Sequence, residues 1–310
     1  MSEISKYRLV TRSDMDGLVC AILLKQMDML SDIKFVHPKD VQDGKIEMSA
    51  SDITTNLPYS PEVHLSFDHH SSEMLRVGSG RSNQVNDPHA PSTARVVYNY
   101  FGGKARFSNI SEEMLKAVDK ADSAQYTLED VLHPQGWELL SFLMDARTGL
   151  GLFKDFTISN YNLMMKLIDY CQQHSIEEIL ALPDVKERVD LFFAHQDQFC
   201  DQIKRCSNVY DHLVVLDLRN EPIIYAGNRF MIYALYPECS VSIHLLWGLN
   251  KQNTVFAVGK SIFNRSSQID VGDLMLEYGG GGHEAAGTCQ VPNDKAEVTR
   301  KELISRLRHS

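Results

Sequence analysis

The stretch Thr11-Arg12-Ser13-Asp14-Met15-Asp16-Gly17 joins two apolar segments of different period. Before it, residues 7–10 predict a short strand, and after it residues 18–30 carry apolar side chains at helical spacing. A polar turn from a strand into a helix lies at the carboxyl end of the strand, where open parallel sheets bind their ligands. We therefore expect this Asp-x-Asp-Gly turn to face a ligand, although the pattern alone is common in ordinary turns and helix caps.

The rest of the N-terminal half alternates short apolar runs with helical patterns. Further strands are predicted at residues 33–36, 45–48 and 63–67, with another short one at Val85. Pro91 is expected in the first turn of a helix that ends at Gly102-Gly103. This alternation predicts an α/β domain with a mostly parallel sheet flanked by helices.

From Ser111 to Cys206 the pattern is helical, and the last predicted helix is long enough to connect two domains. Helices are predicted at residues 112–121, 134–145, 160–173, 176–182 and 185–206. Strands follow at 212–217, 221–226, 239–247 and 254–259, with a helix at 229–236. We therefore predict a first domain at 1–185, a helical linker at 186–209 and a smaller α/β domain at 210–310, with the active site in the cleft between the domains.

The composition of the 310 residues, 43% hydrophobic and 23% charged, is that of a globular protein and excludes a disordered chain, a fibre or a coiled coil. The net charge of −10 argues against a protein that coats duplex nucleic acid, but not against a local cationic site for a short anionic substrate. Six scattered cysteines without a C-x-x-C pair predict reduced thiols and no zinc site. No signal-peptide pattern and no long apolar run is evident, so we expect a cytoplasmic protein.

Acidic residues also follow later predicted strands. Asp52 follows the third, and Asp68-His69-His70 follows the fourth. Carboxylates that converge with Asp14 and Asp16 on one crevice repel each other, and a divalent cation relieves that repulsion. Mixed carboxylate and imidazole ligands suit Mn²⁺, with Fe²⁺, Co²⁺ and Mg²⁺ as competitors. A lone His-His pair is more often an ordinary surface feature. The prediction of a metal site therefore rests on the Asp-His-His motif together with the upstream Asp-x-Asp-Gly turn.

A second signal lies downstream, where Gly279 to Gly282 precede His283 and Glu284. Four glycines in a row allow the backbone to approach a ligand closely and to offer N–H groups to an anion. The following residues are predicted to start a helix whose N-terminus attracts phosphate. Arg265 is a candidate phosphate clamp. The competing interpretations are a flexible linker and a solvated surface arginine.

Asp68-His69-His70 together with the Gly279–Gly282-His283 segment resembles the DHH phosphoesterase superfamily over nearly the whole chain. The similar branch carries a C-terminal DHH-associated domain and includes nanoRNases, cyclic-dinucleotide phosphodiesterases and exopolyphosphatase-related proteins. The resemblance implies a manganese-dependent hydrolase, with one or two ions, that cleaves phosphodiester bonds of short oligonucleotides or linear or cyclic dinucleotides. It also implies that the first domain is catalytic and that the second binds substrate.

The resemblance also implies a role for each matching residue. Asp14 binds a first metal ion, Asp52 bridges to a second, and Asp68 orients a histidine. His70 faces the phosphate or the leaving group. The second ion is held by Asp16, His69 and Asp122, with Asp119 as the alternative to Asp122. The distal phosphate or terminal nucleotide is held by Arg265, Gly281, Gly282 and His283.

Arg12 departs from this pattern, because many members of the subgroup have a metal-binding histidine two residues before Asp14. A guanidinium has no lone pair to give, so we hypothesise a weakened or empty first metal position, with Arg12 gripping a phosphate or neutralising carboxylates. An exopolyphosphatase or pyrophosphatase, and a catalytically weakened nucleotide-binding protein, therefore remain alternatives. A homodimer is also possible. Residues 144–149 are either part of the cleft floor or a helix end with a capping ion pair.

Overall fold

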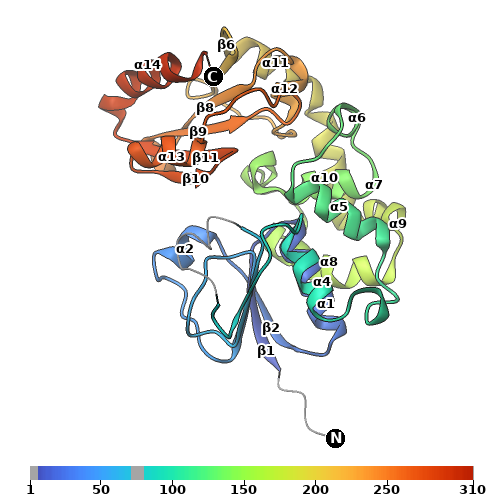
Figure 1. Cartoon of the computed structure of the whole chain (residues 1–310). Coiled ribbons are helices and arrows are strands. Elements are labelled where there is room, and N and C mark those ends of the chain that lie inside the picture. Colours follow the sequence, from blue (N-terminus) through green and yellow to red (C-terminus); the bar gives the residue numbers. More distant parts are fainter. Residues whose placement is uncertain (1–5, 71–79, 310) are drawn as a thin grey trace, which may run out of the picture. The chain divides into compact units, whose positions relative to one another are not determined.

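The structure is a computed structural model that describes residues 6–70 and 80–309. The chain forms two compact units. The first contains Met1–Gln125 and Pro134–Asp190, and the second contains Tyr126–His133 and Leu191–Ser310 (Figure 1). The main division between the two units therefore lies near Asp190. The segment Tyr126–His133, from the N-terminal half of the sequence, belongs to the second unit. The domain boundaries that were predicted from sequence at residues 185 and 209 remain predictions.

A five-stranded sheet forms the centre of the first unit, with strand order β2-β1-β3-β4-β5 and every neighbouring pair parallel. Its strands are β1 (Tyr7–Thr11), β2 (Leu30–Phe35), β3 (Asp52–Thr55), β4 (Leu65–Asp68) and β5 (Gln84–Asn86). The predicted parallel sheet is confirmed, including the short strand at Val85. Because all five strands run the same way, the polar residues that follow them gather at one edge of the sheet.

Helix α1 (Figure 1) is the most buried helix in the described part of the first unit, and it begins at Met15, within the Asp-x-Asp-Gly motif. Its residues from Met15 to Leu24 are all buried, because it packs against the sheet and also contacts α4, α5 and α8. A helix that is apolar all round is stable only in such an interior position. The helices of this unit are α1 (Met15–Gln26), α2 (Pro38–Gln42), α4 (Thr93–Tyr100), α5 (Glu112–Asp122), α7 (Gly136–Met144), α8 (Asn160–Gln173), α9 (Ile176–Ala181) and the first part of α10 (Pro183–Ala194), with 3₁₀ turns η1 (Gly103–Ala105), η2 (Ala146–Thr148) and η3 (Leu150–Leu152).

The third predicted strand is wrong in position. Residues 45–48 form no strand, and the third strand is β3, which begins at Asp52. The alternation of apolar and polar residues at 45–48 resembles an edge strand, whereas β3 (Asp-Ile-Thr-Thr) is buried at every position and carries no such alternation. The helix predicted from Pro91 begins at Thr93, because the Ser92 side chain accepts the N–H of Arg95 and caps it.

The second unit contains a six-stranded mixed sheet with strand order β10-β11-β9-β8-β7-β6, in which β7 and β8 are parallel and the other pairs antiparallel. Its strands are β6 (Ser207–Tyr210), β7 (Leu213–Asp217), β8 (Val241–Trp247), β9 (Thr254–Lys260), β10 (Gly281–His283) and β11 (Ala286–Val291). Its helices are α6 (Leu128–Leu132), α11 (Gln196–Cys206), α12 (Met231–Leu235), α13 (Val271–Glu277) and α14 (Ala296–Leu307), with 3₁₀ turns η4 (Leu249–Lys251) and η5 (Asn293–Lys295). Apolar residues of β7, β8, β9, α13 and α14 share one core.

Two predictions in this region are wrong. Residues 221–226 form no strand, because their backbone is bonded to side chains: Gln202 of α11 accepts the Tyr225 N–H and donates to the Ile223 carbonyl. The single helix predicted at 185–206 is two helices, α10 and α11, separated by His195, whose Nδ1 accepts the N–H of Ala226 at 3.2 Å.

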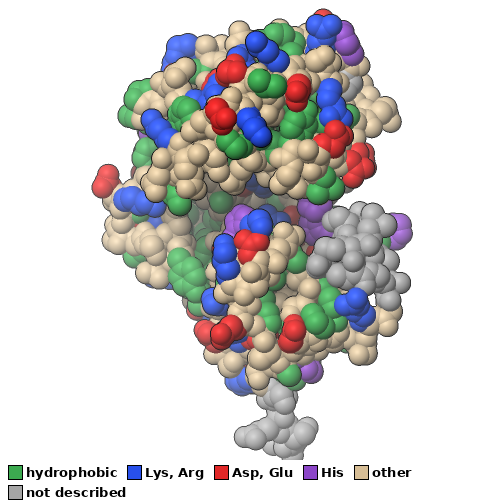
Figure 2. All heavy atoms as spheres, turned by 90° about the vertical axis from the view of Figure 1, so that its left-hand side faces the viewer, with side chains coloured by type: hydrophobic (Ala, Val, Ile, Leu, Met, Phe, Trp, Pro, Cys, Tyr) green, Lys and Arg blue, Asp and Glu red, His purple; other side chains and the backbone are tan. Residues whose placement is uncertain are grey.

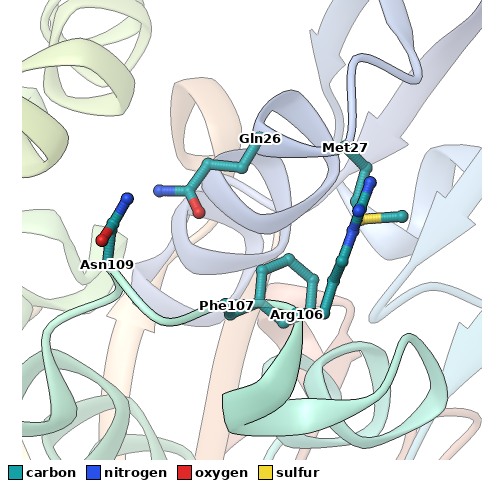
Figure 3. Close-up of a pocket in the computed structure, with 5 residues that line it drawn as sticks. All are labelled: Gln26, Met27, Arg106, Phe107 and Asn109. Atoms are coloured by element: carbon teal, nitrogen blue, oxygen red, sulfur yellow. The ribbon is translucent and has the colours of Figure 1, made fainter.

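Lys and Arg side chains are interspersed with Asp and Glu on the face shown in Figure 2, without a broad patch of one sign. No helix in the described part of the chain is long and apolar enough to cross a membrane. One hollow in the first unit is lined by Gln26, Met27, Arg106, Phe107 and Asn109, with the Arg106 Nε donating to the Met27 sulfur at 2.9 Å (Figure 3). It lies at the C-terminal end of α1, about 17 Å along the helix from the Asp-x-Asp turn. The hollow is therefore separate from the acidic residues of that turn.

Candidate metal centre

Three side chains from distant parts of the sequence meet in the first unit. Asp16 lies in the first turn of α1, His69 directly follows β4, and Asp122 is the last residue of α5. One ligand atom from each lies within 4.8 Å of the others, and this is the group of potential metal ligands found among residues 6–70 and 80–309. The resemblance implied that these three residues share one metal ion, and the fold brings their side chains together.

Asp16 is fixed by the start of another helix. Its Oδ1 accepts the N–H of Ala94 at 2.7 Å, and its Oδ2 accepts the N–H of Thr93 at 3.2 Å. The side chain is buried, and burial raises the pKa of the Asp16 carboxyl well above its usual value, with further contributions from the charges of Asp122 and Asp14. A bound cation would remove this electrostatic cost.

His69 faces Asp122 across a short distance. The Nδ1 of His69 lies 3.1 Å from the carbonyl oxygen of Ala90, which directs Nε2 toward the Oδ2 of Asp122 at 2.6 Å. Although burial opposes it, the interaction with Asp122 raises the pKa of His69 to about 9. The same interaction holds the pKa of Asp122 below its usual value despite burial.

The donor atoms fit a divalent cation. His69 Nε2 and Asp122 Oδ2 are buried and make no hydrogen bond of acceptable geometry in the described part of the molecule. Two carboxylate oxygens and one imidazole nitrogen form a ligand set that Mn²⁺ and Mg²⁺ accept. The Nδ1 contact with a backbone carbonyl is the kind of interaction that commonly orients a metal-binding histidine.

Asp14 is held differently from the three-residue group. It caps α1 by accepting the N–H of Gly17 at 3.0 Å, and its Oδ2 lies 3.1 Å from Nε of Arg12. Burial raises the pKa of Asp14, and the Arg12 charge opposes that shift. Gly17 is required in this turn, because a Cβ there would lie 2.0 Å from the Arg12 carbonyl oxygen. The Arg12 guanidinium is therefore paired with Asp14, the carboxylate that was predicted to bind the first metal ion.

Asp68 and His70 form a pair beside the metal ligands. The Oδ1 of Asp68 accepts the N–H of His69 at 2.9 Å and lies 2.7 Å from Nδ1 of His70. Asp68 is almost fully buried, whereas the His70 side chain is 23% exposed. The orienting role that the resemblance implied for Asp68 remains a prediction.

Asp52 does not lie where it was expected from sequence. It begins β3 opposite Arg8, whereas the carboxyl end of β3 is Thr55, about 10 Å further along the strand. Both Asp52 oxygens are bonded to Arg8, at 2.7 and 2.9 Å, and Oδ2 also accepts the N–H of Ser49. The expectation that Asp52 stands at the ligand-binding edge is therefore wrong, because β3 begins seven residues later than the strand predicted at 45–48.

The residue that does follow β3 is Asn56, which was not among the residues expected from sequence. It has a positive φ of 54° and is buried, and its N–H donates to the carbonyl of Phe67 on β4 at 3.1 Å. Neither polar atom of its side chain has a hydrogen-bond partner in the described part of the chain. A correct strand assignment would have identified it as the polar residue at this edge. Asp119, the alternative to Asp122, is bonded to Ser92 and Arg95 instead.

The glycine-rich segment belongs to the second unit, and its predicted helix is wrong. Gly281–His283 is strand β10, which turns directly into β11. The glycines permit close packing, since a Cβ at Gly282 would lie 2.3 Å from the carbonyl oxygen of Ala286. Arg265, in the same unit, donates its Nε to the carbonyl of Ile262 at 3.0 Å. The predicted substrate roles of Arg265, Gly281, Gly282 and His283 remain predictions.

Comparison with known proteins finds a solved structure of high sequence identity to this chain. No family model and no curated protein sequence matches the chain. Among solved structures, the chain is similar to a pGpG-specific phosphodiesterase, PggH from Vibrio cholerae, with 58% identity, a TM-score of 0.83, and coverage of 98% of this chain and 99% of that one. RecJ from Thermus thermophilus shares the fold, with 14% identity: its Mn²⁺ complex has a TM-score of 0.53 and its Mg²⁺ complex 0.52, over 53% and 50% of the RecJ chains.

Proposed function

Because the chain belongs to the DHH phosphoesterase superfamily, we propose that it is a divalent-metal phosphodiesterase that cleaves short linear dinucleotides such as pGpG into mononucleotides. The observation that carries this proposal is the 58% identity, over the full length of both chains, to a pGpG-specific phosphodiesterase. The net charge of −10 and the mixture of Lys and Arg with Asp and Glu on the face shown in Figure 2 agree with a short substrate rather than a long polyanion.

Asp16, His69 and Asp122 are proposed to hold the cation, with Mn²⁺ preferred and Mg²⁺ or Co²⁺ as substitutes. Such a cation supplies a water of lowered pKa as the nucleophile and withdraws charge from the phosphate. His70, positioned by Asp68, is proposed to protonate the departing oxygen. Arg12 lies next to Asp14 and is proposed to stabilise negative charge on the phosphate.

Arg265, Gly281, Gly282 and His283 are proposed to bind the far end of the substrate. Backbone N–H groups of a glycine segment and an arginine guanidinium are groups that suit a terminal phosphate or nucleotide. Recognition of that end favours substrates of two or a few nucleotides.

The experiment that tests this function is a substrate panel with purified protein. We expect Mn²⁺-dependent release of guanosine monophosphate from pGpG, slower cleavage of other dinucleotides and little release of orthophosphate from polyphosphate. Asp16→Asn, which removes one proposed ligand, is the inactive control. Preferential release of orthophosphate from polyphosphate would contradict the nuclease function and favour the exopolyphosphatase alternative.

Arg12 is the observation that favours a second candidate, a nucleotide-binding protein with a weakened metal centre. Its guanidinium pairs with Asp14, so one predicted metal ligand already has a cationic partner. Tight binding of pGpG without turnover in Mn²⁺, together with gain of turnover in Arg12→His, would favour this candidate.

A further inference from the structure

Thr93 is the first residue of α4, and it contacts one of the proposed metal ligands directly. Its backbone N–H donates to Oδ2 of Asp16 at 3.2 Å, and the next N–H, that of Ala94, donates to Oδ1 at 2.7 Å. Because a Thr Oγ1 lies within roughly 4 Å of its own backbone nitrogen in every rotamer, this Oγ1 is at most about 7 Å from Asp16 Oδ2. Covalent geometry therefore keeps the Thr93 hydroxyl close to the three-residue group of Asp16, His69 and Asp122.

The hydroxyl of Thr93 is buried without a hydrogen-bond partner. The residue is 0% exposed, and its Oγ1 makes no hydrogen bond within residues 6–70 and 80–309. His69 Nε2 and Asp122 Oδ2, two atoms of the three-residue group, are unpartnered in the same way. Burying a hydroxyl without a hydrogen bond costs free energy, and a valine would fill the same space without that cost. The cost is offset if the hydroxyl gains a partner when the cation binds.

A water molecule next to the cation is the partner that fits. Asp16, His69 and Asp122 supply three ligand atoms, whereas Mn²⁺ and Mg²⁺ prefer about six in octahedral sites and fill the remaining positions with water. A hydroxyl that bonds such a water lies about 5 Å from the cation. The position of Thr93 Oγ1 beside Asp16 is compatible with that distance. Waters buried in proteins typically bond polar groups that have no other partner.

We propose that Thr93 is a positioning residue of the metal centre, whose hydroxyl hydrogen-bonds a water molecule in the coordination shell of the cation. This inference rests on the proposed function, because it takes a divalent cation at the three-residue group. The backbone of Thr93 orients Asp16, and its side chain orients the water, so one residue at the start of α4 orders two members of the shell. Groups that orient a metal's ligands in this way commonly contribute to metal affinity.

The test is a titration of the metal-free proteins with Mn²⁺, in which electron paramagnetic resonance measures the free ion. Thr93→Val replaces the hydroxyl with a methyl group and is expected to weaken Mn²⁺ binding roughly 10-fold, which is less than the loss in Asp16→Asn because all three ligands remain. Thr93→Ser keeps the hydroxyl and should restore most of the affinity. The melting temperature of metal-free Thr93→Val should equal or exceed that of wild type, since no hydrogen bond is lost.

Thr54→Val is the matched control. Thr54 Oγ1 is likewise buried and unpartnered among the described residues, but Thr54 lies within β3, where it pairs with Val10 of β1 and Ser66 of β4. Its substitution removes a buried hydroxyl of the same kind without touching the contact to Asp16. We therefore expect Thr54→Val to leave Mn²⁺ affinity unchanged.

Unchanged Mn²⁺ affinity in Thr93→Val, or a loss that Thr93→Ser does not restore, overturns the proposal. A lower melting temperature of metal-free Thr93→Val also overturns it, because the hydroxyl would then support the fold rather than the water. If Thr93→Val does not fold, Thr93→Ala removes the same hydroxyl. Wild-type protein whose Mn²⁺ affinity depends on the Thr93 hydroxyl, but which releases no mononucleotide from pGpG, would contradict the proposed function and leave the role of Thr93 intact.

Discussion

The carboxylate of Asp68 lies 2.7 Å from Nδ1 of His70 and is almost fully buried. A buried carboxylate in this position fixes the orientation of the ring and favours the proton on Nδ1, so that Nε2 becomes the atom available for proton exchange. The same oxygen also accepts the N–H of His69. One side chain therefore orders both histidines of the motif.

Asp68→Asn is expected to lower kcat for pGpG roughly 10- to 100-fold, because the His70 ring loses its orienting charge. KM should change much less, since Asp68 has no proposed contact with substrate. Steady-state kinetics gives both constants, and metal content measured on the same sample checks that the ligands remain in place. An unchanged kcat would show that the pair has no part in the reaction.

Asp16→Asn is expected to weaken Mn²⁺ binding by more than about 100-fold, because it removes a charged ligand from a three-residue group. Asp119→Asn is the matched control: it lies on the same helix as Asp122 and bonds Ser92 and Arg95 rather than the group. Titration of the metal-free proteins with Mn²⁺ measures both. Equal affinities in the two variants would speak against the assignment of Asp16.

Asp52→Asn is expected to reduce the free energy of unfolding by about 1–3 kcal/mol at neutral pH, while Mn²⁺ affinity stays unchanged. Burial opposes the shift, but the bonds from Arg8 and Ser49 hold the pKa of Asp52 below its usual value. A lowered folded-state pKa means that this stabilisation is present above the unfolded-state pKa of about 4 and is lost as pH falls through the folded-state value.

Denaturant unfolding of wild type and Asp52→Asn at several pH values tests this. The difference between the two proteins should shrink as the solution is acidified below about pH 4. Loss of Mn²⁺ binding in Asp52→Asn at neutral pH would instead restore the bridging role that the resemblance gave this residue.

Arg12→His is expected to increase the number or occupancy of bound Mn²⁺ ions, because an imidazole replaces a group that cannot ligate and removes the cation beside Asp14. Metal content by mass spectrometry and anomalous scattering from Mn²⁺-grown crystals are the measurements. Two fully occupied ions in the wild-type protein would show that Arg12 does not weaken the first position.

Gly282→Ala is expected to destabilise the second unit by about 1–3 kcal/mol, because its Cβ would meet the Ala286 carbonyl at 2.3 Å and the Gly287 Cα at 2.4 Å. Gly281→Ala is the matched control, since its nearest neighbour would be the Leu276 side chain at 3.9 Å. Thermal unfolding distinguishes them. Equal melting temperatures would show that the hairpin can shift to admit the methyl group.

The residues that determine the first unit could be identified from sequence, because their signals are local. The strand-turn-helix pattern around Asp14 and Asp16 and the apolar strand before Asp68 each lie within a few consecutive residues. Parallel strands then bring the following polar residues to one edge whatever the details of packing. Asp122, by contrast, was assigned by resemblance, and α5 brings it to His69 only through tertiary packing.

Only the tertiary structure decided where Asp52 and Asn56 lie. The third strand begins at Asp52 and not at residue 45, so Asp52 lies at the opposite end of the sheet and Asn56 lies at the ligand-binding edge. The position of this strand depends on its pairing with β1 and β4 rather than on the local apolar pattern. The approach of His69 Nε2 to Asp122 Oδ2, at 2.6 Å, likewise joins residues far apart in sequence. Local sequence fixes which side chains follow a strand or cap a helix, whereas charges act through space, and only the packed chain sets those distances.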